Sequence, residues 1–143
     1  MIDRSMDIPA ALDRLSRHKN AVLITLRADG RAQSSDIVYA VDGDRIRISV
    51  TDDRAKTRNL RRDNRAVLHF TDPATWSYLS IDALADVSAA AEAPDDATVD
   101  ALVDLYRAVA GEHDDWDSYR TAMVADGRCV VTLTPRSVTG QLN

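Results

Sequence analysis

Residues 21–50, AVLITLRADGRAQSSDIVYAVDGDRIRISV, decide the fold because they hold three apolar runs separated by two turn signals. The pair Asp29-Gly30 favours a tight hairpin turn, and Asp42-Gly43-Asp44 supplies the second turn. The last run, residues 45–50, alternates charged or polar residues with apolar ones, as a strand with one solvated face does. We therefore expect three antiparallel strands in meander order, over 21–26, 32–41 and 45–50.

Further strands and helices flank this meander on both sides. Residues 7–15 and 54–63 have helical spacing, and an aspartate is available to cap the second of these helices. Apolar residues also repeat at helical spacing between Asp96 and Gly111 and over 115–125. Strands are expected over 66–70, from Trp76 towards Val87, and over 128–134. The sequence thus predicts an α+β fold, a small split antiparallel β-barrel of about six strands with peripheral helices, formed by residues 1–143 as one domain.

Composition excludes several classes of protein. The chain has 143 residues, of which 45% are hydrophobic and 29% charged, as expected for one soluble globular domain. No apolar run approaches the roughly 18 residues of a membrane helix, and residues 1–7 lack the order of a signal peptide. Cys129 is the only cysteine, which excludes an internal disulfide and a cysteine-rich zinc site. We expect a cytoplasmic protein with no membrane partner.

Six basic residues gather within residues 54–65, although the chain carries a net charge of −5. They are Arg54, Lys56, Arg58, Arg61, Arg62 and Arg65, accompanied by one acid, Asp63. Cations in the first turn of a helix oppose the helix dipole, and like charges three or four residues apart repel each other. This placement indicates an anion site suited to phosphate. The alternative is a solvated helix whose arginines pair with aspartates. Nucleic acid is disfavoured because the basic residues occupy a single short segment and the pI is 5.1.

Other catalytic signals are weak. The three histidines, His18, His69 and His113, lie far apart without metal-ligand spacing, and Cys129 sits in an apolar strand typical of a buried thiol. No nucleophile elbow, P-loop or dinucleotide-binding glycine motif occurs. We therefore assign no catalytic residue and no metal, and expect a bound cofactor to supply any chemistry.

The segment from Asp53 to Asp63, followed by Trp76-Ser77-Tyr78, resembles the flavin/deazaflavin oxidoreductases related to pyridoxamine 5′-phosphate oxidase. More narrowly, it resembles their group B, which uses coenzyme F420. The likeness continues through Leu105-Tyr106-Arg107 and Asp115-Trp116-Asp117. It implies a split-barrel homodimer with two cofactor sites in grooves at the subunit interface. It also implies hydride transfer from the reduced deazaflavin to a small unsaturated or quinone-like acceptor.

The resemblance also implies a set of cofactor-binding residues. The phosphate and acidic tail would meet Arg54, Lys56, Thr57 and Arg58, and the end of the preceding strand would approach the cofactor through Ser49 and Val50. Gln33 and Ser35 would face the ring system. The second subunit would contribute Trp76, Ser77 and Tyr78. The tail of F420 carries a phosphate diester and several carboxylates, so a six-cation segment suits it better than it suits FMN alone.

Two alternatives stay open. The first is an FMN-dependent enzyme similar to pyridoxamine 5′-phosphate oxidase, which would need arginines for a substrate phosphate that this sequence does not identify. The second is a non-catalytic protein that binds or stores F420, since no residue is an evident general acid.

Overall fold

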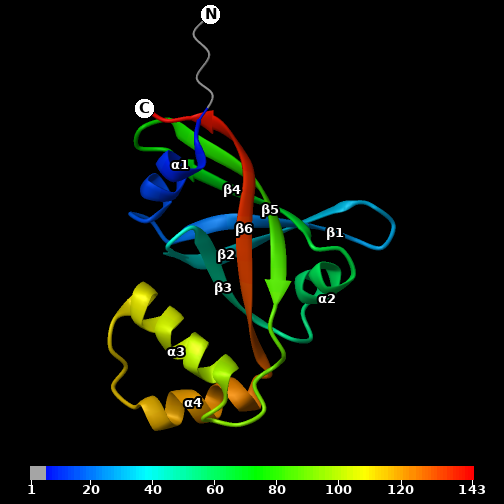
Figure 1. The fold of residues 1–143 in the computed structure, drawn as a ribbon, viewed down its shortest axis with the longest axis vertical. Helices are drawn as coiled ribbons and strands as arrows, with labels where there is room; N and C mark the ends of the chain where they lie inside the picture. The colour runs from blue at the N-terminus through cyan, green and yellow to red at the C-terminus, as the bar shows by residue number, and fades with distance from the viewer. Residues whose placement is uncertain (1–5) are drawn as a thin grey trace, which may run out of the picture.

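Within residues 6–143, six antiparallel strands close into a barrel and four helices lie around it (Figure 1). The computed structural model describes residues 6–143, so the expectation about a signal peptide, which depends mainly on residues 1–5, lies outside the described part. The strands are β1 (Asn20–Leu26), β2 (Ala32–Asp42), β3 (Arg45–Thr51), β4 (Arg65–Asp72), β5 (Ser77–Val87) and β6 (Arg128–Gln141). The helices are α1 (Ile8–Leu15), α2 (Ala55–Arg62), α3 (Ala97–Ala110) and α4 (Trp116–Ala125).

The strand order around the barrel is β1-β2-β3-β6-β5-β4, and β4 pairs with β1 to close it. The predicted meander is confirmed, because β1 pairs with β2 and β2 with β3, both antiparallel. The chain leaves β3 through α2 and returns as β4, whereas α3 and α4 connect β5 to β6. The predicted α+β class with an antiparallel barrel is therefore correct.

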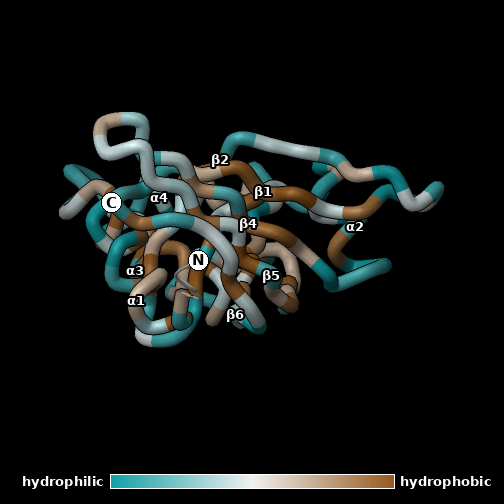
Figure 2. The backbone as a smooth tube through the Cα atoms, turned by 90° about the horizontal axis from the view of Figure 1, so that it is seen from above, coloured by the Kyte–Doolittle hydropathy of each residue, from teal (hydrophilic) through white to brown (hydrophobic). Residues whose placement is uncertain are grey.

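Alternation along the strands fills the barrel with branched and aromatic side chains. In β3 every second residue, Ile46, Ile48 and Val50, is buried, while the residues between them are half-buried on the outer face. Figure 2 shows hydrophobic stretches concentrated along the strands. Each fully buried side chain of this size contributes about 1.5–3 kcal/mol. The barrel core therefore follows directly from the period-2 pattern in the sequence.

A second, smaller core joins the helix pair α3 and α4 to the outer face of β6. Leu102 and Val103 of α3 pack with Met123 of α4 against Val130 of β6. Asp96 caps α3 by accepting a hydrogen bond from the backbone N–H of Val99 at 2.8 Å, and it also accepts from the backbone N–H of Glu92, in the preceding loop, at 2.8 Å. These hydrogen bonds hold the pKa of the Asp96 carboxyl below its usual value. The helix pair thus has its own apolar attachment, beside which the site described below is formed.

Every strand boundary except the end of β6 lies within two residues of the sequence prediction, and two of the differences have an evident cause. Strand β5 begins at Ser77 because Trp76 has a left-handed backbone with φ of 57°. Strand β6 continues to Gln141, well beyond residue 134, although Pro135 and Gly140 are typical of strand ends. Pro135 fits because it pairs beside a register shift in β5, and Gly140 fits because a Cβ there would lie 2.2 Å from the carbonyl oxygen of Tyr78.

Candidate cofactor-binding site

Helix α2 begins without a side-chain cap. Arg54 occupies the N-cap position, so the prediction of an aspartate cap is wrong. The Thr57 hydroxyl instead reaches back and donates to the carbonyl oxygen of Thr51 at 2.7 Å, which closes the turn. Among residues 6–143, no acceptor takes the backbone N–H groups of Ala55 and Lys56. The positive end of the helix dipole is therefore open to an anion.

Several arginines of the basic segment have structural partners. Arg61 pairs with Asp52 and Arg65 with Asp63, each at 2.8 Å. Arg62 donates to the carbonyl oxygen of Leu26 at 2.7 Å. For Arg61 and Arg65 the alternative weighed above, arginines that pair with aspartates, describes the structure, whereas Arg62 binds a backbone carbonyl. Arg58 donates to the Asp53 carbonyl oxygen and remains exposed at the start of the helix.

Unlike these arginines, neither Arg54 nor Lys56 donates a side-chain hydrogen bond within residues 6–143, and no carboxylate oxygen in that range lies within 4.0 Å of their charged groups. A third cation, Arg128, joins them from β6, where it pairs with Thr51 in the barrel register. Its Nη1 lies 3.4 Å from the Ser49 hydroxyl, and its buried Nε has no hydrogen-bond partner. We call Arg54, Lys56 and Arg128 the cation cluster.

The cation cluster is electrostatically strained. Burial lowers the pKa of the Lys56 ammonium, and the charges of Arg54 and Arg128 lower it further. A charged group that is partly removed from water and faces like charges gains most from a bound anion. Phosphate and carboxylate oxygens match these donors, and an arginine can bind either one in a bidentate manner.

Beside the cluster lies a cavity of about 380 Å³, a size typical of small-molecule sites. Ser49, Lys56 and Arg128 form its polar side, and Asp36 on β2 is its one carboxylate. The opposite wall comes from α3 and α4 and is largely apolar and aromatic. Its members are Leu105, Tyr106, Val109, Tyr119 and Met123. Tyr106 and Tyr119 contact each other edge to face, with ring centroids 5.0 Å apart. The cavity therefore joins an anion site to a surface suited to a planar ring.

Gln33 and Ser35 lie on β2 just before the strand reaches the cavity. Both are half-buried, and the oxygen of the Gln33 amide accepts a hydrogen bond from Asn59 at 2.7 Å. The same Asn59 amide donates to the Thr25 hydroxyl at 3.1 Å, and its oxygen accepts from Arg62 at 3.0 Å. Asn59 is buried and fully hydrogen-bonded, so it holds the side-chain oxygen of Gln33 in place. The NH₂ group of Gln33 remains free to donate elsewhere.

The remaining predicted site residues are divided between the barrel core and its far end. The side chains of Val50 and Thr57 are buried, so a ligand meets these positions only through the backbone. Ser77 is buried too, where its hydroxyl accepts from the backbone N–H of Asn143 at 2.8 Å. Trp76 and Tyr78 are exposed at the β4–β5 turn, which lies near α1 and away from α2 (Figure 1). Within one chain, Trp76 and Tyr78 therefore do not lie beside the cation cluster.

Sequence reasoning missed Arg128, Asn59 and the wall formed by α3 and α4. Arg128 follows Gly127 at a strand start and has no basic neighbour, so nothing local marks it. Asn59 lies inside the basic segment and was overlooked because its partners come from β1 and β2. Of the wall residues, Leu105 and Tyr106 had a local signal, within the Leu105-Tyr106-Arg107 run.

Other chemistry is limited. The Cys129 thiol is buried, and burial raises its pKa, as expected for an unreactive core residue. Within residues 6–143, no three histidine, cysteine or acidic side chains gather to hold a metal ion. In the same range, no helix is both long and apolar enough to cross a membrane.

The sequence matches the pyridoxamine 5′-phosphate oxidase family over residues 8–141, and the chain belongs to this family. A solved structure of an F420 reductase is 26% identical and superposes with a TM-score of 0.67, over 87% of this chain and 92% of that one. The family and fold thus include oxidoreductases, in agreement with the resemblance described above.

More distant structures share the fold. A conserved hypothetical protein of Mycobacterium tuberculosis is 20% identical with a TM-score of 0.75, over 98% of this chain and 87% of that one. A heme storage protein of Vibrio cholerae is 14% identical with a TM-score of 0.68, over 94% of each chain. At these identities the likeness concerns the barrel and not the ligand.

Proposed function

We propose that this protein is an oxidoreductase that binds coenzyme F420 and uses it to reduce a small unsaturated or quinone-like organic molecule. The observation that carries the proposal is the cation cluster, three positive groups that have no carboxylate oxygen within 4.0 Å among residues 6–143, beside a cavity with an aromatic wall. The F420 reductase among the similar structures supports the same cofactor.

The residues present suit the two halves of such a cofactor. Arg54, Lys56 and the free N–H groups at the start of α2 would hold the phosphate, and the unpartnered Nε of Arg128 offers one more donor. Tyr106 and Tyr119 would cover the ring and exclude water from it. Gln33, oriented by Asn59, would donate to a ring carbonyl.

When bound, the reduced deazaflavin supplies a hydride, so the protein's task is to hold donor and acceptor in contact. The proton that completes the reduction has no assigned donor on this chain. The Tyr119 hydroxyl donates to the carbonyl oxygen of Leu102 at 3.0 Å, and burial raises its pKa, so it serves the structure better than it serves proton transfer.

We propose further that the working unit is a homodimer in which Trp76 and Tyr78 contact the cofactor bound by the partner. Trp76 is 85% exposed and has a left-handed backbone at the last residue of the β4–β5 turn, an unusual conformation for a large apolar side chain. Its distance from the cation cluster of its own chain supports a role in trans.

An FMN enzyme is the second candidate, because the cation cluster would also hold a single phosphate. A binding protein without turnover is the third, and the heme storage protein that shares the fold makes it worth testing.

Titration of the purified protein with F420 and with FMN, followed by cofactor fluorescence, separates the first two candidates. We expect tighter binding of F420, and tighter binding of FMN would overturn the proposal. Reduced F420 mixed with a panel of quinones and unsaturated ketones then tests turnover. Tight binding of F420 without oxidation by any acceptor would favour the storage role.

A further inference from the structure

Two parts of the chain that are remote in sequence meet the turn between β4 and β5. Helix α1, the end of β6 and this turn lie together at one end of the barrel (Figure 1). Hydrogen bonds join all three, through Arg14 of α1, Ser77 at the start of β5 and Asn143, the last residue of the sequence. We call these three residues the turn clamp. None of them lines the cavity beside the cation cluster, so the site described above does not account for them.

The turn clamp surrounds a residue with a strained backbone. Trp76 has a φ of 57°, and within residues 6–143 no other residue except glycine has a positive φ. A bulky side chain rarely adopts this conformation, because its Cβ crowds the backbone. The indole is 85% exposed, so burial within its own chain does not offset the strain. Such a conformation persists only where the surrounding contacts impose it.

Ser77 is the fixed point of the turn. It is buried, and its hydroxyl oxygen accepts from the backbone N–H of Asn143 at 2.8 Å and from the Nη1 of Arg14 at 3.2 Å. The hydroxyl of Thr75, on the other side of Trp76, lies 2.8 Å from the same oxygen. The residues before and after Trp76 are therefore tied to one buried atom.

Asn143 and Arg14 complete the network. The side-chain amide of Asn143 donates to the carbonyl oxygen of Trp76 at 3.1 Å, which fixes the strained residue directly. The carbonyl oxygen of Asn143 in turn accepts from the Nη2 of Arg14 at 3.1 Å. The planar guanidinium presents several donors in a fixed fork, so one arginine can bind both Ser77 and Asn143. Arg14 is itself held, because α1 packs its buried face into the barrel core.

We propose that Arg14 and Asn143 are positioning residues, which hold Trp76 ready to contact the cofactor bound by the partner subunit. This inference rests on the homodimer and the contact in trans proposed above. An exposed side chain on a free turn loses conformational entropy when it binds, whereas a turn that is already fixed loses less. The turn clamp therefore raises the affinity for the cofactor without touching it, and Ser77 serves the site through the backbone.

Time-resolved fluorescence anisotropy of Trp76 tests the turn clamp without any ligand. The chain has two tryptophans, so the Trp116→Phe variant reports on Trp76 alone. In this background we expect Arg14→Met and Asn143→Ala to increase the nanosecond motion of the indole. Asn143→Ala keeps the backbone N–H that binds Ser77 and removes only the side-chain contact with Trp76. Unchanged motion in both variants would overturn the proposal.

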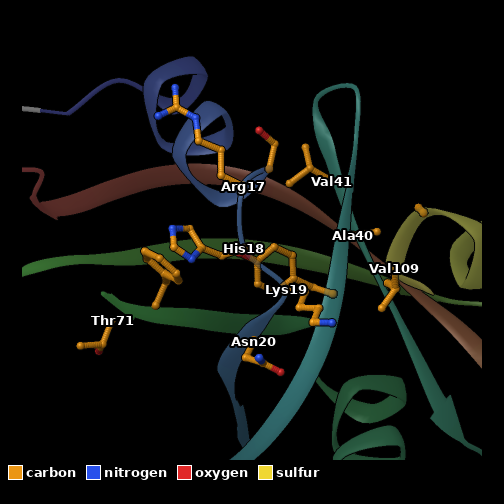
Figure 3. Close-up of a pocket in the computed structure, with 12 residues that line it drawn as sticks. Arg17, His18, Lys19, Asn20, Ala40, Val41, Thr71 and Val109 are labelled. Atoms are coloured by element: carbon orange, nitrogen blue, oxygen red, sulfur yellow. The ribbon is translucent and has the colours of Figure 1, made fainter. Parts of the chain in front are cut away.

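Arg17→Met is the matched control for Arg14→Met. Arg17 lies three residues further along, points away from His18 and Thr71 (Figure 3) and pairs with the exposed Asp13 at 2.8 Å. Its replacement removes the same charge without touching the β4–β5 turn. It should leave the motion of Trp76 unchanged, and an increase equal to that of Arg14→Met would overturn the assignment of Arg14.

A double-mutant cycle on F420 affinity separates positioning from a general structural role. Asn143→Ala should weaken F420 binding about three- to tenfold in the wild-type protein, but less than about twofold in Trp76→Ala, because its effect passes through Trp76. Equal losses in the two backgrounds would overturn the proposal. A wild-type protein that does not bind F420 would refute the cofactor contact, whereas the anisotropy measurement decides separately whether Arg14 and Asn143 hold Trp76.

Discussion

Replacing Lys56 by methionine should have opposite effects on the empty and the ligand-bound protein. The substitution keeps the length of the side chain and removes its charge. In the structure this charge is half-buried, without a carboxylate within 4.0 Å among the described residues, and it faces Arg54 and Arg128. Without a ligand the charge destabilises the fold, and with an anion bound it stabilises the complex.

The expected magnitudes follow from these neighbours. Like charges on neighbouring helix positions cost about 0.2–0.5 kcal/mol each, so removing one that faces two others should stabilise the ligand-free protein by about 0.5–1 kcal/mol. A lost charge-assisted hydrogen bond to phosphate costs about 1.5–3 kcal/mol, which weakens F420 binding roughly 10- to 150-fold.

Urea unfolding of the ligand-free protein and fluorescence titration with F420 measure the two effects. Lys19→Met is the matched control, because Lys19 is the only other lysine in the sequence and does not line the cavity beside the cation cluster. It should change neither quantity appreciably. A Lys56→Met variant that loses stability, or that binds F420 as tightly as the wild type, would refute the assignment of Lys56 to an anion site.

The pH dependence gives a second test of the same residue. The folded-state pKa of Lys56 is below its ordinary value of 10.5, so between these two values the unfolded chain holds more protons than the native one. Stability should therefore rise with pH across that interval. Tyr39 has the opposite effect, since burial raises its pKa. Above its ordinary value of 10.0 the native chain keeps a proton that the unfolded chain has lost, so this residue makes stability fall as pH rises. The difference between wild type and Lys56→Met isolates the lysine, and a difference that does not vary with pH would contradict this account.

Three further substitutions test the fold and the proposed dimer. Asp96→Ala removes the cap of α3 and should lower the free energy of unfolding by about 1–2 kcal/mol in urea titration, whereas Asp95→Ala, which caps no helix, should not. Gly140→Ala forces a Cβ against the Tyr78 carbonyl and should cost about 2–4 kcal/mol by thermal unfolding; a wild-type melting temperature would show that β6 does not pair there. Trp76→Ala should change stability by no more than about 0.5 kcal/mol but weaken F420 binding at least about tenfold, and unchanged affinity would exclude Trp76 from the site.

The strands were predictable because their determinants are local. Period-2 alternation in residues 45–50 and the turn signals at Asp29-Gly30 and residues 42–44 depend on neighbours within a few positions, and the structure confirms all three strands. The prediction was less accurate where a local signal is overridden from a distance. Pro135 and Gly140 are typical of a strand end, yet pairing with β5 carries β6 past both.

The sequence by itself determined that an acidic chain concentrates cations at the start of one helix. Only the tertiary structure decided which of these charges remain available, because electrostatic interaction depends on distance in space and not along the chain. Folding places Asp52 beside Arg61 and removes that arginine from the site. It also brings Arg128 from the last strand to Lys56 and closes the cavity with α3 and α4. The basic segment thereby becomes a site of two residues completed by a third that the sequence did not indicate.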